Sequence, residues 1–164
     1  MGLPPTIPAA LLRAAEQFGD REALIDGSSR WTFADLADAA LRSAGAMIAA
    51  GVEPGDRVAV WAPNGRLFVA AALGAVTAGA VLVPLNTRFK GDEAAWILGR
   101  SRARLLVTDN GFLGNDYVGM LRDAELPSLA EVIVLNGPGG LSWPTSSDAV
   151  PKYRGTRRWR ARTR

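Results

Sequence analysis

Four short runs of apolar, largely β-branched residues recur along the chain at nearly even intervals. They lie at 58–61, 81–83, 105–107 and 132–135, and their first residues are 23, 24 and 27 positions apart. These intervals are too long for hairpin turns, and each is long enough for a crossover helix between parallel strands. Parallel sheets that are covered on both faces require continuous apolar strands of this kind. The spacing therefore predicts an α/β fold with a mainly parallel sheet and flanking helices.

The intervals between the apolar runs carry helical patterns with recognisable ends. A helix is predicted to begin after Thr32, with Asp35 completing a capping box, and to stop at Gly51. A second helix, apolar on almost all sides and therefore buried, is expected to follow Asn64 as its N-cap. A third is expected to open at Asp92, where an acid suits the positive end of a helix.

Three further elements are predicted from weaker patterns. They are an amphipathic helix over 9–18, a small hairpin that joins 23–25 to 30–32 through Asp26 and Gly27, and a helix over 113–121. After residue 135 the pattern stops. We interpret 1–135 as part of one domain, 136–151 as a turn-rich linker and 152–164 as a basic, disordered tail.

Basic residues are concentrated at the carboxyl end of the chain. The net charge is +3, yet residues 1–151 hold 12 Lys and Arg against 16 Asp and Glu, a net charge of −4. Seven basic residues lie within 152–164. Because the basic character belongs to these last residues alone, we do not expect a nucleic-acid partner for the folded part.

Three interpretations of the basic tail remain open. With Tyr153 and Trp159 among its arginines, it is a candidate for binding nucleic acid or an anionic surface. It also fits a solvated terminus without a function of its own. The interpretation that we favour is out-of-frame translation of a frameshifted or truncated gene. Reading the downstream DNA in the other frames decides between them.

Cysteine and histidine are both absent from the chain. Their absence excludes disulfides, thiolate and imidazole metal ligands, and every nucleophile–histidine arrangement. The longest run of small apolar residues, 67–83, is interrupted by Gly74, Thr77 and Gly79, so no membrane span is expected. The first residues lack the basic and uninterrupted apolar regions of a secretory signal, so we expect a cytoplasmic location.

Several stretches, in this order, resemble the opening motifs of adenylate-forming enzymes: 31–36 (WTFADL), 51–60 (GVEPGDRVAV), 63–64 (PN) and 79–86 (GAVLVPLN), followed by Arg88 and Glu93. The resemblance covers residues 5–135 and is to the N-terminal segment of AMP-forming acyl-CoA synthetases. It implies ATP-dependent activation of a carboxylic or fatty acid to acyl-AMP, followed by transfer to coenzyme A. Magnesium is the usual companion of the ATP.

The motifs that carry this family's chemistry are not found in the chain. Residues 145–152 echo the ends of the family's phosphate loop, but they contain no glycine and place Asp148 where phosphates would approach. Residues 137–140 are too short and interrupted by proline for a phosphate cradle. The only two lysines, Lys90 and Lys152, lack the context of the family's catalytic lysine. We therefore assign no catalytic, cofactor-binding or metal-ligating residue.

Residues within the matching motifs have structural interpretations. Asp56 and Arg57 are expected to make an ion pair or hydrogen bonds at the edge of a turn. Asn86 and Arg88 follow a strand, so 84–88 is the loop best placed for a ligand, because open α/β sheets bind ligands beyond the carboxyl ends of their strands. No reacting partner for them is identifiable, and no role is assigned.

The preferred hypothesis is therefore a ligase fragment that is catalytically incomplete by itself. No cofactor is expected for this chain alone, and the expected partner is a polypeptide that carries the missing part of the adenylation domain. The alternatives are a non-catalytic α/β interaction module and a small anion-binding protein that acts through its tail. We also expect marginal stability, because missing parts of the fold would leave apolar sheet faces uncovered.

Overall fold

The computed structural model describes residues 6–138 and 141–142. The helices are α1 (Ile7–Phe18), α2 (Phe33–Ala49), α3 (Arg66–Thr77), α4 (Gly91–Ser101) and α5 (Tyr117–Met120), with a short 3-10 helix, η1 (Phe112–Gly114). The strands are β1 (Glu22–Asp26), β2 (Ser29–Thr32), β3 (Arg57–Trp61), β4 (Val81–Pro84), β5 (Leu105–Thr108), β6 (Glu131–Val134) and β7 (Leu141–Ser142).

Strands β3 to β7 form one parallel sheet in the order β4-β3-β5-β6-β7. The four predicted strands are present, each within one residue of its predicted ends. In sequence order the chain builds outward from β3 to β4, then returns to the other side of β3 for β5. This is a doubly wound order with a topological switch point between β3 and β5. The predicted α/β fold with a mainly parallel sheet is confirmed.

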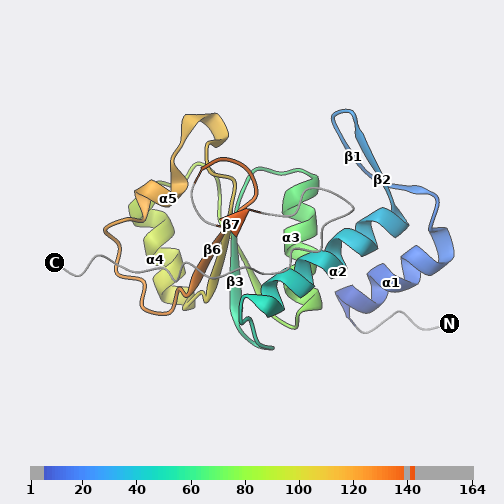
Figure 1. Ribbon diagram of the computed structural model, residues 1–164, viewed down its shortest axis with the longest axis horizontal. Helices are drawn as coiled ribbons and strands as arrows, with labels where there is room; N and C mark the ends of the chain where they lie inside the picture. The colour runs from blue at the N-terminus through green and yellow to red at the C-terminus, as the bar shows by residue number, and fades with distance from the viewer. Residues whose placement is uncertain (1–5, 139–140, 143–164) are drawn as a thin grey trace.

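Helices cover both faces of the sheet. Figure 1 shows α2 and α3 on one side of it and α4 and α5 on the other. Side chains of each strand alternate between these two layers: Val58 and Val60 pack with Met47 of α2, whereas Ala59 and Trp61 pack with Leu98 of α4. The strands β3, β5 and β6 are thus covered, whereas Val81 of the edge strand β4 is 53% exposed, and the expected marginal stability stays a prediction.

The predicted N-terminal helix and hairpin are also present. α1 packs on α2, and β1 pairs with β2 in an antiparallel register that sets Ile25 opposite Arg30. Figure 1 places both elements on the side of α2 and α3 that is remote from the sheet. The hairpin returns the chain to the start of α2, which lies across α3.

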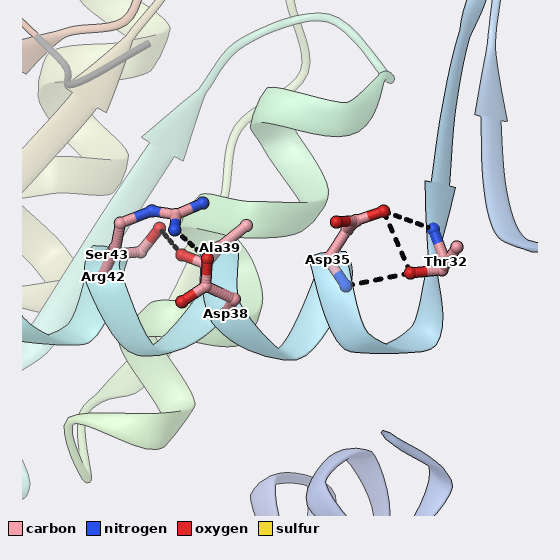
Figure 2. Close-up of polar contacts among 6 residues, drawn as sticks. All are labelled: Thr32, Asp35, Asp38, Ala39, Arg42 and Ser43. Atoms are coloured by element: carbon pink, nitrogen blue, oxygen red, sulfur yellow. Dashed lines mark hydrogen bonds and ion pairs between the residues drawn. The ribbon is translucent and has the colours of Figure 1, made fainter. Parts of the chain in front are cut away.

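The capping box predicted for α2 is confirmed. The hydroxyl of Thr32 accepts a hydrogen bond from the backbone N–H of Asp35 at 3.1 Å, and the Asp35 carboxylate accepts one from the Thr32 N–H at 2.9 Å (Figure 2). One turn further on, Arg42 pairs with Asp38 on the exposed side of the helix. The capping box thus satisfies the backbone N–H groups of Thr32 and Asp35 at the start of this helix.

The packing of α2 against α3 depends on small residues. The hydroxyl of Ser43 is buried and donates to the Ala39 carbonyl at 2.7 Å, within its own helix (Figure 2). Gly74 of α3 lies directly against it, because a Cβ added at Gly74 would be 2.3 Å from the Ser43 Cβ. The two helices therefore approach more closely than any larger side chain at position 74 would permit.

The start of α3 differs from the sequence-based expectation. Its N-cap is Gly65 rather than Asn64, and no side chain of the cap residue bonds to the helix. The Asp26 carboxylate, at the end of β1, accepts the Arg66 N–H at 3.0 Å and lies 3.3 Å from the Arg66 guanidinium. The cap thus comes from a hairpin 40 residues upstream, which no local pattern around Asn64 reveals.

Asp26→Ala is expected to lower the free energy of unfolding by about 1–2 kcal/mol, because the first turn of α3 loses its acceptor. Urea denaturation measures the change. Asn64→Ala, at the cap position that the sequence suggests, is expected to change stability by less than about 0.5 kcal/mol. Equal losses in the two variants would contradict the assignment of Asp26 as the cap.

The helix predicted over 113–121 is not continuous. It is divided into η1 and the four-residue α5, because Gly111, Leu113 and Gly114 have φ values of 115°, 53° and 75°, which a right-handed helix does not allow. Within the predicted linker, β7 adds a short strand that pairs with Ile133 and Val134 of β6. The basic tail at 152–164 lies outside the described residues.

Candidate functional site

A cleft of about 260 Å³ opens at the carboxyl ends of β3, β5 and β6. It lies at the switch point between β3 and β5, which is where open α/β sheets bind ligands. The loop after β3 and the first turn of α3 form one wall, the segments after β5 and β6 form another, and the hairpin contributes one side chain. Its polar lining includes Asp26, Asn64, Arg66, Asp109 and Asn136.

Each charged side chain of the cleft already has a polar partner within it. Asp26 caps α3 and contacts the Arg66 guanidinium, and Asp109 accepts a hydrogen bond from the Asn136 side-chain amide at 3.1 Å. The positive end of α3, a natural position for an anionic ligand, therefore already holds the carboxylate of Asp26. The remaining lining is largely apolar and includes Phe68 and Phe112. The arrangement suits the binding of a small molecule better than acid–base chemistry.

Magnesium-bound ATP, which the resemblance implies, does not fit this cleft. A triphosphate would meet the Asp26 and Asp109 carboxylates, and the helix N-terminus that could hold it is capped. Across the described ranges no three His, Cys, Asp or Glu residues form a group that could hold a metal ion. No step of chemistry is therefore assigned to ATP or magnesium in this part of the fold.

Asp56 and Arg57 lie at the opposite, amino end of the sheet. The Arg57 guanidinium donates to the carbonyls of Ser101 at 2.8 Å and Arg102 at 2.9 Å, both at the end of α4. The Asp56 carboxylate accepts from the Glu53 N–H at 3.0 Å and pairs with Arg104 at 3.4 Å. These contacts fasten loops to the sheet, and they match the structural role expected for both residues.

The loop after β4 forms a tight turn over residues 86–89, here named the Asn86 turn. The Asn86 carbonyl accepts the Phe89 N–H at 3.1 Å, and its side-chain oxygen accepts the Arg88 N–H at 2.9 Å. The Arg88 side chain is exposed. This turn lies at the carboxyl edge of the sheet, as predicted, but it does not line the cleft.

Two buried aromatic residues, which the sequence did not single out, hold the Asn86 turn. The Trp61 indole N–H donates to the Asn86 carbonyl at 3.0 Å, and the Tyr117 hydroxyl donates to the Thr87 carbonyl at 3.0 Å. The two rings are in contact, tilted by 50° with 4.3 Å between their centroids, and are fully buried. A buried Trp or Tyr needs a hydrogen-bond partner for its N–H or O–H group. This requirement was the only signal in the sequence that could have pointed to these two residues.

Lys90 and the turn after β6 both make contacts that stabilise the fold. Lys90 precedes α4 as its N-cap, and its backbone N–H donates to the Glu93 carboxylate at 2.9 Å. Gly137 has a φ of 94°, and a Cβ there would be 1.5 Å from the Asn110 carbonyl oxygen. The Pro138 carbonyl accepts from the Asn110 side chain at 2.7 Å. This described part of 136–140 is therefore a closely packed turn.

The other segments considered from the sequence are not described. Lys152 and the 145–152 stretch that echoes a phosphate loop lie outside the described residues. Their interpretation as a chance echo remains a prediction.

The carboxyl group of Asp116 has a pKa that its hydrogen bonds lower. The Gly119 backbone N–H, at 2.8 Å, and the Asn110 side-chain amide, at 3.1 Å, hold the pKa of its carboxyl below the ordinary value of 3.8. The ionised form is therefore favoured in the folded protein. Its contribution to stability is present above pH 3.8 and is lost as the pH falls through the lower folded-state pKa.

Asp116→Asn is therefore expected to be less stable than the parent chain near neutral pH and equally stable at strongly acidic pH. Urea unfolding at a series of pH values measures the two free energies. Their difference should shrink as the pH falls below 3.8. A difference that stays constant over this range would show that the carboxylate charge does not stabilise the fold.

Solved structures with the same fold identify its class. The chain superposes on the anthranilate CoA ligase AuaEII, in complex with anthranoyl-AMP, with a TM-score of 0.74 and 27% identity, covering 82% of this chain and 26% of that one. It superposes on the N-terminal domain of FACL13 from Mycobacterium tuberculosis with a TM-score of 0.73 and 28% identity, covering 79% and 33%. The fold is that of the N-terminal domains of adenylate-forming enzymes.

The family follows from the sequence comparison. Residues 11–157 match the AMP-binding enzyme family, so the chain belongs to it, as the motifs predicted. The match continues through 136–151 and into the first residues of the basic tail. Over 142 residues the chain is 45% identical to the 3-[(3aS,4S,7aS)-7a-methyl-1,5-dioxo-octahydro-1H-inden-4-yl]propanoyl:CoA ligase of Rhodococcus jostii (strain RHA1).

A relative of the same name from Mycobacterium tuberculosis is 47% identical over 128 residues. These alignments cover 84% and 78% of this chain, but only 28% and 25% of the relatives. The chain thus spans about a quarter of the length of the curated relatives that it matches. No helix in the described residues is long and apolar enough to cross a membrane.

Proposed function

We propose that this chain is the N-terminal part of a cytoplasmic, ATP-dependent acyl-CoA ligase and is catalytically incomplete by itself. The reaction would activate a carboxylic acid as acyl-AMP and transfer the acyl group to coenzyme A. The observation that carries the proposal is the combination of 45% and 47% identity to two CoA ligases with coverage of only 28% and 25% of their lengths. A separate polypeptide would carry the remaining three quarters of the fold.

The contacts at the cleft support a scaffold role for the chain. The switch-point cleft has its α3 terminus capped by Asp26, and its second carboxylate, Asp109, is held by Asn136. Phosphoryl and adenylyl transfers depend on positioned cations and donors around the phosphates. The charged groups of the cleft are instead engaged in holding the hairpin and the loops together. The phosphate-binding groups would therefore come from the complementary polypeptide.

The names of the two relatives suggest the first acid to test. Both contain a methyl-dioxo-octahydroindenyl propanoyl group, a bulky bicyclic body on a short carboxylic acid arm. We propose an acid of this class as the substrate of the complete enzyme. Fatty acids, which the family resemblance also implies, are the second set.

The proposal is tested by exchange of labelled pyrophosphate into ATP in the presence of these acids. The 164-residue chain alone is expected to give no exchange above background. A chimera in which residues 1–138 replace the matching segment of the Rhodococcus jostii ligase is expected to give exchange that depends on the acid. The ligase without its N-terminal segment is the control and should be inactive.

Two results would overturn the proposal. Acid-dependent exchange by the chain alone would show that it is catalytically complete. A chimera that folds but gives no exchange would show that this segment cannot serve a ligase, and would favour the non-catalytic interaction module.

A further inference from the structure

The Asn86 turn is held in a way that its own sequence does not require. A turn closed by the Phe89 N–H and the Asn86 side chain is already complete by local bonds. Two additional donors, the Trp61 indole and the Tyr117 hydroxyl, reach its successive carbonyls from β3 and α5. Both of these side chains are fully buried, whereas Asn86 is exposed and Thr87 half-buried, so each bond joins a buried donor to a carbonyl near the surface.

This arrangement fixes the orientation of two neighbouring peptide groups. Because the carbonyls of Asn86 and Thr87 both face the buried aromatic pair, neither peptide can rotate without leaving a buried donor unpaired. The side chains of Asn86 and Arg88 are correspondingly exposed. The two rings pack against each other, and Trp61 is anchored further by the Thr108 hydroxyl, which donates to its carbonyl at 2.9 Å.

The turn follows β4, the neighbour of β3, at the carboxyl end of the sheet. Loops at this end carry ligand contacts in open α/β folds, and such contacts need a rigid support. We infer that Trp61 and Tyr117 are positioning residues that fix the Asn86 turn as part of the substrate-binding surface of the complete enzyme. This inference rests on the proposed ligase function. Trp61 and Tyr117 do not contact the substrate themselves; they affect its binding by holding the Asn86 turn.

Burial keeps the Tyr117 hydroxyl able to donate its hydrogen bond to the Asn86 turn at neutral pH. It raises the pKa of the Tyr117 hydroxyl above its ordinary value of 10.0, so the group stays protonated and able to donate. Tyr117→Phe and Trp61→Phe each remove one donor and keep a ring in place. They are therefore the variants that test positioning with the least change in packing.

The first test uses the complete 164-residue chain and limited digestion with trypsin. Trypsin needs a locally opened backbone to cut after Arg88, and losing one buried hydrogen bond should make that opening about tenfold more frequent. Cleavage after Arg88, followed by mass spectrometry, should therefore accelerate about tenfold in Tyr117→Phe. Ser43→Ala is the matched control, because it also removes a buried hydroxyl that donates to a backbone carbonyl, but within α2 and not at the Asn86 turn.

Ser43→Ala is expected to leave cleavage after Arg88 close to the parent rate. If Tyr117→Phe were cut at the parent rate, or no faster than Ser43→Ala, the turn would not be held by the aromatic pair. That result would overturn the inference.

The second test uses the active chimera. In Tyr117→Phe and Trp61→Phe, the KM for at least one of ATP, the acid and coenzyme A should rise by about tenfold while kcat changes by less than about twofold. A purely structural role predicts unchanged KM values in the fraction of enzyme that remains folded, as expected for Ser43→Ala. Unchanged KM values in both aromatic variants would overturn the positioning role.

The two tests separate this inference from the proposed function. If the parent chimera shows no exchange, the ligase proposal fails, and with it the role of the turn in substrate binding. The digestion then still decides whether Trp61 and Tyr117 hold the turn.

Discussion

Trp61→Ala is expected to lower the free energy of unfolding by about 4 kcal/mol, among the largest losses that a single substitution in this fold can cause. The side chain is fully buried between β3 and the layer of α4 and α5, and its ring lies against that of Tyr117. Its removal leaves a large cavity and takes a donor from the Asn86 carbonyl. Urea unfolding followed by far-ultraviolet circular dichroism measures the loss.

The chain contains its own control for this substitution. Trp96 lies on the outer side of α4 with 69% of its surface exposed, so Trp96→Ala should change stability by less than about 0.5 kcal/mol. If Trp61→Ala does not fold at all, Trp61→Phe is expected to fold with a smaller loss of about 1–2 kcal/mol. Similar losses for Trp61→Ala and Trp96→Ala would contradict the packing described here.

Gly74→Ala and Gly45→Ala are expected to change stability in opposite directions. The new Cβ at Gly74 would lie 2.3 Å from the Ser43 Cβ, so α2 and α3 must separate, at a cost of about 2–3 kcal/mol. At Gly45, also within a helix, a Cβ would have no atom within 4 Å. There the better helix propensity of alanine should stabilise the fold by about 1 kcal/mol.

Thermal and urea unfolding of the two alanine variants measure these changes side by side. Because the substitution is chemically identical, any difference arises from the surroundings of the two positions. Stabilisation by Gly74→Ala would show that α2 and α3 do not approach as closely as described.

Local patterns in the sequence predicted most of the elements of this fold. The strands were recognisable because each is apolar on both sides, and the start of α2 because Thr32 and Asp35 satisfy each other within one turn. The start of α3 was misplaced because its cap, Asp26, comes from 40 residues away. The order of the strands in the sheet has no local signal either, since it depends on which face each connecting helix covers.

The candidate site was less predictable than the fold for the same reason. The sequence indicated the carboxyl end of the sheet and the 84–88 loop. It did not indicate the cleft, whose lining combines the hairpin, α3 and the loops after β5 and β6. Nor did it reveal that Trp61 and Tyr117, which are 56 positions apart, meet under the Asn86 turn. Such contacts are determined by tertiary packing and have no spacing that could be recognised beforehand.

The edge strand β4 offers little to a strand of a second molecule that could pair with it. The N–H groups of Val81 and Leu85 donate to the carbonyls of Asp56, just before β3, and of Val60 in β3. Leu82 and Pro84 therefore present their backbone to the outside. Proline has no N–H, which leaves this edge with a single outward amide donor. A strand from a second molecule would therefore find no regular ladder to extend, which disfavours intermolecular β-pairing at this edge.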